Sequence, residues 1–147
     1  MHVSLTGSTG FVGRHLLEHL LQAGHRVTAL VRDPTSEGAS ALMRRPISAN
    51  VQLTLVQGDV VDAGGLEDAL RGSHTEIHLV GIIAEVGKQT FERVHVRGTE
   101  NVVQAARRVG VKRFVQMSAI GARPNGVSEY QTSKYRAEEA VRNSGIP

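Results

Sequence analysis

The sequence contains no cysteine, and aromatic residues make up only 3% of its 147 residues. Without cysteine the chain can form no disulfide framework, no cysteine-ligated zinc cluster and no thiol nucleophile. The first residues, Met-His-Val-Ser-Leu, lack the basic and apolar regions of a signal peptide, and no apolar run approaches the length that spans a membrane. We therefore expect a cytoplasmic protein without a membrane span.

A block of charge of one sign is also missing. The formal net charge is +3, and the basic residues are scattered among acidic ones. Together with the scarcity of aromatic residues, this favours a solvated surface over a nucleic-acid face, so we expect no nucleic-acid partner. The length and the ordinary apolar content indicate one domain over residues 1–147.

Apolar alternating runs and amphipathic runs follow each other along the chain, which is the pattern of a parallel sheet with crossover helices. The expected strands are 2–6, 26–31, 51–57, 76–80 and 112–117. The expected helices are 11–23, 65–70, 89–109 and 130–143, with a loop over 35–50 that could hold a short helix at 39–44. The fold class is therefore α/β, a doubly wound parallel sheet of the Rossmann type. Because no strand follows the last helix, we expect the front part of a longer fold, ending before a sixth strand and the substrate-binding part.

One glycine-rich turn organises the chain, and its glycines are Gly7, Gly10 and Gly13. The turn joins the first expected strand to the first expected helix. Glycine permits a tight turn, a close approach of the backbone to a pyrophosphate, and close packing of helix on strand. The N–H groups and the positive dipole end of the helix would then face the anion. We predict a dinucleotide site formed by Gly7, Ser8, Thr9, Gly10, Phe11, Val12 and Gly13.

The residue that contacts the adenosine ribose is expected about 20 residues beyond the glycine turn, which is at Arg32 and Asp33. An acid there favours the free 2′-hydroxyl of NAD, whereas arginine suits the 2′-phosphate of NADP. Because Arg32 comes first, and Asp33 before Pro34 can instead cap a turn, we predict NADP, with NAD as the alternative. Asp59, at the end of the third strand, either meets the adenine edge or forms a turn after Gly58.

A second group of residues could carry chemistry. Tyr130 and Lys134 are four residues apart at the start of a helix and share one of its faces. A nearby ammonium stabilises tyrosinate, so Tyr130 could pass a proton to or from an alcohol or carbonyl during hydride transfer. Ser118 follows the fifth strand, at the sheet edge where ligands bind, and could polarise the same carbonyl. On its own this spacing is commonplace, but behind a dinucleotide turn it indicates a catalytic group.

Metal chemistry has a weaker basis in the sequence. His15 and His19 are four residues apart on the first expected helix and could in principle share a metal. No acidic partner accompanies them as it does in a zinc-protease helix. We therefore predict no metal site.

Three motifs together resemble the short-chain dehydrogenase/reductase superfamily, in its extended or atypical branch. They are the glycine pattern 7–13, Asp59-Val60, and Tyr130-x-x-x-Lys134. Residues 95–101, His-Val-Arg-Gly-Thr-Glu-Asn, resemble the NAD(P)-dependent epimerase/dehydratase group. Residues 111–122 are similar to the accessory NADPH-binding subunit of respiratory complex I and its bacterial relatives. The resemblance covers essentially the whole chain.

This resemblance implies roles for particular residues. Tyr130 would be the acid/base, and Lys134 would bind the nicotinamide ribose and tune Tyr130. Ser118 would orient a small-molecule substrate. Val80 and Gly81, with the Asp59-Val60 pair, would lie against the cofactor.

The chain departs from the family in two ways. The family commonly has asparagine where this chain has His95, and its substrate pocket comes largely from a C-terminal part that these residues do not include. Two functions therefore stay open. One is an NADP-dependent oxidoreductase or sugar-nucleotide epimerase-like enzyme. The other is a non-catalytic NADP(H)-binding module with a structural or redox-sensing role, and a homodimer or a larger complex is an open expectation for either.

Overall fold

The computed structural model describes residues 1–44 and 52–147. Its elements are β1 (His2–Thr6), α1 (Phe11–Gln22), β2 (Arg26–Val31), α2 (Glu37–Met43), β3 (Leu53–Gln57), α3 (Leu66–Leu70), β4 (Thr75–His78), the π-helix η1 (Glu92–Arg97), α4 (Gly98–Val109), β5 (Arg113–Gln116) and α5 (Glu129–Arg142). Within these residues the strands form one five-stranded sheet in the order β3-β2-β1-β4-β5, and all its neighbouring strands are parallel. The predicted α/β fold of the Rossmann type is confirmed.

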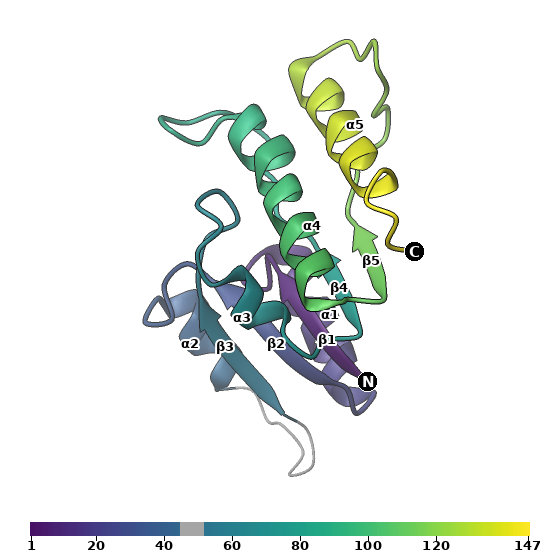
Figure 1. The fold of residues 1–147 in the computed structure, drawn as a ribbon. Coiled ribbons are helices and arrows are strands. Elements are labelled where there is room, and N and C mark those ends of the chain that lie inside the picture. The colour runs from purple at the N-terminus through teal and green to yellow at the C-terminus, as the bar shows by residue number, and fades with distance from the viewer. Residues whose placement is uncertain (45–51) are drawn as a thin grey trace.

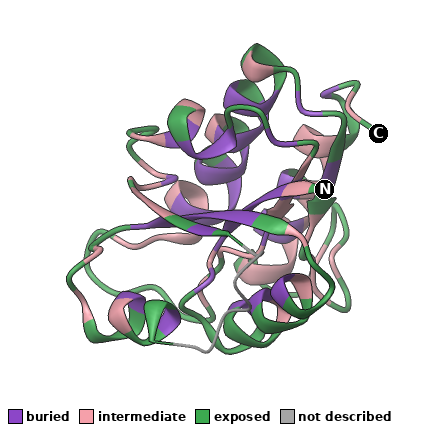
Figure 2. Cartoon of the chain, turned by 90° about the horizontal axis from the view of Figure 1, so that it is seen from below, coloured by how far each residue is buried: buried purple, intermediate pink, exposed green. Residues whose placement is uncertain are grey.

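Helices cover both faces of this sheet (Figure 1). Alternate residues of each strand point to opposite faces. On one face, Leu5 and Val27 join leucines of α1 and α2 in an apolar cluster. On the other face, Leu30 and Phe114 join apolar residues of α3 and α4, and α5 lies beside α4. Figure 2 shows the buried residues gathered in the sheet and on the helix sides that face it.

The strand order reverses direction at β1, which has β2 on one side and β4 on the other. In an open parallel sheet, the crevice outside the carboxyl ends of the strands at such a reversal is where ligands bind. The glycine turn follows β1, and the loop beginning with Leu79 follows β4. The fold therefore brings these two segments to one edge.

Most expected element boundaries agree with the structure to within one or two residues, and two differences matter for the site. The fourth strand ends at His78 and not at Val80, so Val80 belongs to the loop. The long helix does not begin at Gln89, because Gln89 and Val86 exchange two backbone hydrogen bonds in a tight turn, and the helical path then runs through η1. The predicted strand residue Val51 and the part of the predicted loop beyond residue 44 lie outside the described residues. No helix of the described residues is long and apolar enough to cross a membrane.

The sheet face that carries α3 and α4 also holds buried polar side chains. Glu76 lies opposite Ser4, and His78 lies opposite Thr6, whose Oγ1 is 2.6 Å from His78 Nδ1. Glu76 and His78 are both fully buried. Burial raises the pKa of Glu76 to about 7, although the Ser4 and Thr6 hydroxyls oppose this shift. Burial, with the charge of Lys134, lowers the pKa of His78 to about 3.

Replacing Glu76 by glutamine should reduce the fall in the free energy of unfolding that occurs as pH rises from 5 to 8. The folded protein keeps the Glu76 proton up to about pH 7, whereas an unfolded carboxyl releases it near 4.5. The folded state therefore binds more protons in this window, and the free energy of unfolding falls as pH rises through it, by on the order of 3 kcal/mol. Urea unfolding of both proteins at pH 5 and pH 8 measures the difference. An unchanged pH dependence in Glu76→Gln would contradict the assignment.

Candidate functional site

A cavity of about 240 Å³ opens at the carboxyl edge of the sheet. Its walls come from the glycine turn after β1, the ends of β2 and β3, and the loop after β4. Eight of the residues predicted to bind a cofactor line it, namely Gly7, Thr9, Gly10, Arg32, Asp59, Val60, Val80 and Gly81. The other predicted residues lie around this cavity or behind it, as described below.

The glycine turn is built by close backbone contacts. Gly7 has a φ of 80°, and a Cβ there would lie 3.0 Å from the Leu79 carbonyl carbon. The Gly10 N–H donates to the Gly7 carbonyl oxygen at 3.1 Å. At Gly13, in the first turn of α1, a Cβ would lie 2.1 Å from the same oxygen. The third glycine therefore sets how closely α1 approaches the turn, and Gly13 lies behind the cavity wall and not on it.

The N-terminus of α1 is left open by its sequence. Gly10 is the N-cap, no side chain caps the helix, and the first turn holds no acidic residue. The first N–H groups of a helix have no partner within the helix, so these backbone donors and the positive dipole end remain available to an anion. The Phe11 side chain is 72% exposed and packs against His15, at 4.9 Å between ring centroids. Phe11 and the exposed Val12 thus offer backbone groups, while Ser8 is buried and its Oγ has no hydrogen-bond partner.

Arg32 and Asp33 have different surroundings at the end of β2. Arg32 is exposed and lines the cavity. The Asp33 carboxylate accepts bonds from the Thr35 N–H at 2.8 Å and the Thr35 hydroxyl at 2.6 Å, and the Thr35 hydroxyl and N–H lower the pKa of this exposed carboxyl. Asp33 therefore caps the turn into α2, which leaves Arg32 as the side chain at the cavity.

Asp59 combines the two alternatives that its sequence position left open. It lines the cavity, and its carboxylate also accepts the Val61 N–H at 2.9 Å. The Asn101 side-chain amide on α4 donates to the carbonyl of Val60 at 2.8 Å and to that of Val61 at 3.2 Å. A Cβ at Gly98 would lie 3.1 Å from the Val60 side chain. The start of α4 therefore holds this wall of the cavity in place.

Tyr130, Lys134 and Ser118 are not among the residues that line the cavity. Lys134 is buried, and its ammonium donates to the Met117 carbonyl oxygen. A Cβ at Gly81 would lie 3.9 Å from Lys134 Nζ, so this lysine stands directly behind the cavity wall. Burial lowers the pKa of Lys134, and the Glu138 carboxylate opposes that shift.

The two hydroxyl groups of this cluster have unlike surroundings. The Ser118 hydroxyl donates to the Glu138 carboxylate, which also pairs with Arg142 at 2.7 Å. Tyr130 is half-buried, with its ring edge-on to the rings of Phe91 and His95 at 5.7 and 5.5 Å between centroids. Tyr130 is therefore oriented by ring contacts, while the single proton of Ser118 is directed to Glu138.

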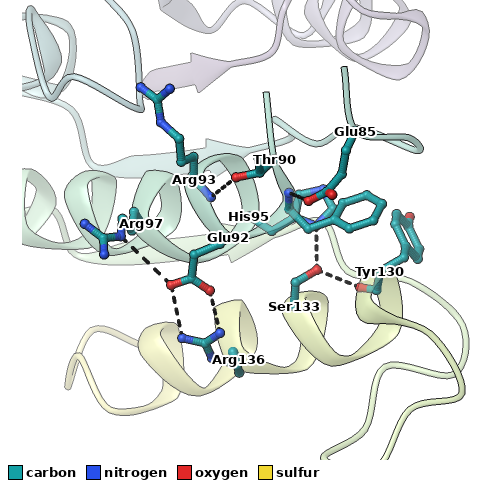
Figure 3. Close-up of polar contacts among 10 residues, drawn as sticks. Glu85, Thr90, Glu92, Arg93, His95, Arg97, Tyr130, Ser133 and Arg136 are labelled. Carbon is teal, nitrogen blue, oxygen red and sulfur yellow. Dashed lines mark hydrogen bonds and ion pairs between the residues drawn. The ribbon is translucent and has the colours of Figure 1, made fainter. Parts of the chain in front are cut away.

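Sequence reasoning missed that His95 and Ser133 connect the loop at the cavity wall to Tyr130. His95 Nε2 lies 3.0 Å from the Ile82 N–H, and its Nδ1 lies 2.9 Å from Ser133 Oγ. Ser133 in turn donates to the Tyr130 carbonyl oxygen at 2.8 Å (Figure 3). Burial, followed by the charge of Lys134, lowers the pKa of His95 to about 4. Glu138 could have been found from its helical spacing to Lys134, but nothing in the sequence linked His95 to a residue 38 positions away.

In the pair His15 and His19, one ring nitrogen of His15 is already engaged by the backbone of its own helix. His15 Nδ1 lies 2.8 Å from the Phe11 carbonyl oxygen. Across residues 1–44 and 52–147, no three histidine, cysteine, aspartate or glutamate residues are grouped as metal ligands would be.

The model of a protein family described as NAD(P)H-binding matches residues 7–147 of this chain. The chain belongs to this NAD(P)H-binding family. The match includes the glycines Gly7, Gly10 and Gly13 and extends over the four strands after the first. It confirms that the cofactor class is NAD(P)H, as the sequence predicted.

Similar proteins place this NAD(P)H-binding chain in the wider group that the sequence motifs indicated. The ceramide reductase of Caulobacter vibrioides is 36% identical over 141 residues, which are 95% of this chain and 41% of that protein. The 3 beta-hydroxysteroid dehydrogenase type 7 of Mus musculus is 32% identical over 150 residues, covering 97% of this chain and 40% of that protein. The resemblance to short-chain dehydrogenases and to the epimerase/dehydratase group is confirmed.

Solved structures agree with this assignment. MoeE5 in complex with UDP-glucuronic acid and NAD has a TM-score of 0.77 at 25% identity, and the match covers 98% of this chain and 49% of that one. The NADPH-dependent quinone oxidoreductase QOR2 of Escherichia coli, complexed with NADPH, has a TM-score of 0.75 at 27% identity, covering 98% and 46%. The NAD(P)H-binding chain thus spans less than half the length of each of these four relatives.

The residues around the cavity fit a dinucleotide of this class. Side chains at Gly7 and Gly13 would meet backbone atoms, so the turn is shaped for close backbone approach. The uncapped start of α1 supplies N–H donors for phosphate, and the buried Ser8 Oγ is an orphaned polar atom within the same turn. Arg32 is the cation among the cavity-lining residues, at the end of β2 where the adenosine ribose is bound.

Substituting Gly13 by alanine should destabilise the fold and abolish cofactor binding. Its Cβ would press on the Gly7 carbonyl oxygen, which is backbone and cannot move aside without shifting α1. Overpacking of this kind costs about 1–3 kcal/mol. Gly64→Ala is the matched control, because nothing lies within 4 Å of a Cβ there. Thermal unfolding and NADPH titration of both variants measure the effect, and equal behaviour of the two would contradict it.

Substituting Arg32 by alanine should weaken NADPH binding about tenfold, since a charge-assisted contact to phosphate is lost, while NADH binding changes little. Calorimetric titration with both cofactors measures the ratio. Arg71→Ala is the control, because Arg71 is equally an exposed arginine but pairs with Asp68 and is not among the cavity-lining residues. An equal loss of affinity for NADPH and NADH would show that Arg32 does not read the 2′-phosphate.

Proposed function

We propose that this chain is the cofactor-binding part of an NADP(H)-dependent oxidoreductase that interconverts an alcohol and a carbonyl. The observation that carries the proposal is the position of Lys134, whose ammonium stands behind Gly81 at the cavity wall while Tyr130 lies one helical turn earlier on α5. A proton-transfer group thus lies beside a dinucleotide cavity. The nicotinamide cofactor of this family supplies or accepts a hydride when it is bound.

Each residue of the cluster has a distinct part in this proposal. Tyr130 moves a proton to or from the substrate oxygen, and its half-buried ring is oriented by Phe91 and His95. Lys134 has three donor hydrogens. One binds the Met117 carbonyl oxygen, and the others serve the nicotinamide ribose and stabilise a tyrosinate at Tyr130.

The glycine turn and Arg32 hold the other end of the cofactor. In the proposal, the N–H groups at the start of α1 bind the pyrophosphate, and the Arg32 guanidinium binds the 2′-phosphate of NADP. Val60 and Val80 bound the cavity, and Asp59 meets the adenine edge. The exposed position of Arg32, with the Asp33 carboxylate committed to a turn, supports NADP over NAD.

The rim of the site favours an apolar substrate over a sugar nucleotide. Ile83, Ile120 and Val127 are 91%, 102% and 81% exposed. Each lies within three residues of Gly81, Ser118 or Tyr130 along the chain. Large apolar side chains that are exposed beside the segments carrying a site support an apolar ligand. The ceramide reductase and the hydroxysteroid dehydrogenase described above are named for apolar substrates, which supports the same preference here.

The second candidate is a non-catalytic NADP(H)-binding module with a structural or redox-sensing role. The contact of Ser118 favours it, because a hydroxyl whose proton goes to Glu138 does not donate to a substrate carbonyl in this arrangement. Ser118 as a substrate-orienting residue stays a prediction, as do a homodimer or a larger assembly.

Tyr130→Phe decides between the two candidates. In the first, it should lower turnover by about 10²- to 10⁴-fold, because the phenol is the proton-transfer group, and change the NADPH dissociation constant little. Tyr135→Phe, on the same helix, is the matched control. The measurement is NADPH oxidation by the protein at its natural length, with hydrophobic ketones and UDP-sugars as substrates. Turnover that survives Tyr130→Phe unchanged would exclude this role, and absence of turnover with tight NADPH binding would favour the module.

A further inference from the structure

A π-helix places one buried histidine between the cofactor cavity and the last helix. The π-helix η1 is wider than an α-helix, and such segments are rare and occur often at functional sites. His95 lies in η1 and is 1% exposed. It touches the loop after β4 through one ring nitrogen and α5 through the other. The proposed function uses its ring contact with Tyr130 but neither of its two hydrogen bonds.

The two hydrogen-bond partners of His95 determine which ring nitrogen carries the proton and which group donates in each bond. A backbone N–H can only donate, so the Nε2 that faces the Ile82 N–H must carry a lone pair. The ring is neutral at physiological pH, and the proton is therefore on Nδ1, which donates to Ser133 Oγ. Ser133 uses its own proton for the Tyr130 carbonyl oxygen. One directed chain thus runs from Ile82 through His95 and Ser133 to Tyr130.

Ring contacts reinforce this chain. The His95 ring stacks on Phe91 at 5.3 Å between centroids and 28° between planes, and meets the edge of Tyr130 at 5.5 Å. A Cβ at Gly81 would lie 3.4 Å from His95 Nε2. The imidazole is therefore packed against the cavity wall on one side and the tyrosine ring on the other.

A second contact joins η1 to α5, in addition to the bond between His95 and Ser133. The Glu92 carboxylate binds the Arg136 guanidinium at 2.5 and 3.3 Å (Figure 3). Both side chains are about half exposed, and exposed ion pairs contribute little. The buried link through His95 and Ser133 is the one that can fix the position of α5.

We propose that His95 is a positioning residue that couples the Gly81–Ile82 wall of the cofactor cavity to the Tyr130 end of α5 through Ser133. This inference rests on the proposed function, in which Tyr130 transfers a proton beside the bound cofactor. His95 does not itself exchange a proton with the substrate. It fixes where the Tyr130 phenol lies relative to the Gly81–Ile82 wall. Loss of its bond to Ile82 or of its bond to Ser133 would uncouple Tyr130 from that wall.

The first test measures how firmly the Tyr130 side chain is held, in the absence of cofactor and substrate. The chain has two tyrosines and no tryptophan, so in a Tyr135→Phe background the tyrosine fluorescence comes from Tyr130 alone. Ser133→Ala should lower its anisotropy, because the α5 end of the link is cut. Thr132→Ala is the matched control: it removes a similar hydroxyl-to-carbonyl bond on the same helix, to Ser128, but no contact with His95. Equal anisotropy in the two variants would overturn the proposal.

The second test separates the two ends of the link. Ser133→Ala should leave the NADPH dissociation constant unchanged and lower kcat roughly three- to tenfold, the effect of one hydrogen bond. His95→Phe keeps the ring but cuts both bonds, so NADPH affinity should fall by a similar factor, and His95→Gln, which retains an acceptor for Ile82, should restore that affinity.

The double variant His95→Phe with Ser133→Ala should equal His95→Phe alone, because both act on one chain. Additive losses would overturn the coupling. If His95→Phe does not fold, Ser133→Ala and His95→Gln still decide the case. Failure of the proposed function appears separately, as NADPH binding without turnover, while the anisotropy and affinity results continue to report on the link.

Discussion

The approach of α1 to the turn that precedes it is the contact on which the cofactor edge depends. With no side chain at Gly13, the helix backbone reaches the Gly7 carbonyl oxygen at a distance that a Cβ would reduce to 2.1 Å. This approach sets where the first N–H groups of α1 point. The same turn lies against the Leu79–Val80 backbone, where a Cβ at Gly7 would be 3.0 Å from the Leu79 carbonyl carbon, so the segments that follow β1 and β4 meet at this edge. The cavity is thus shaped by backbone contacts, and side chains are added at its rim.

The sheet accepts polar groups in its core at the same end. Glu76 and His78 lie on the same face of β4, opposite the polar residues Ser4 and Thr6. The charge of Lys134 contributes to the lowered pKa of His78. Buried groups of this kind are tolerated when they stay neutral. A neutral histidine beneath a buried lysine leaves that lysine as the main positive charge of the cluster, with the Glu138 carboxylate as its counterpart.

The features that were predicted well from the sequence are those determined by interactions between residues close together along the chain. The glycine turn, the strands and the face shared by Tyr130 and Lys134 follow from periodicity and from local backbone limits. What could not be predicted depends on distant packing. Asn101 reaches across 41 positions to the Val60 carbonyl, and the Ser118 proton is directed to a carboxylate 20 positions later. The π-helical path of η1 has no periodic signature that distinguishes it from the α-helix expected there.

The π-helix has a consequence for how this chain tolerates insertions and deletions. A π segment holds one more residue per bulge than an α-helix, and each residue of an α-helix turns the chain by about 100°. Removing one residue within Glu92–Arg97 would let the segment relax to an ordinary helix. The elements before it, including the loop that carries Gly81 and Ile82, would then keep their orientation relative to α4, because the wider turn had accommodated the extra residue, whereas the same deletion within α4 would rotate them by about 100°. A single-residue deletion within Glu92–Arg97 is thus tolerated more easily than one within α4, because the π-helical segment absorbs it.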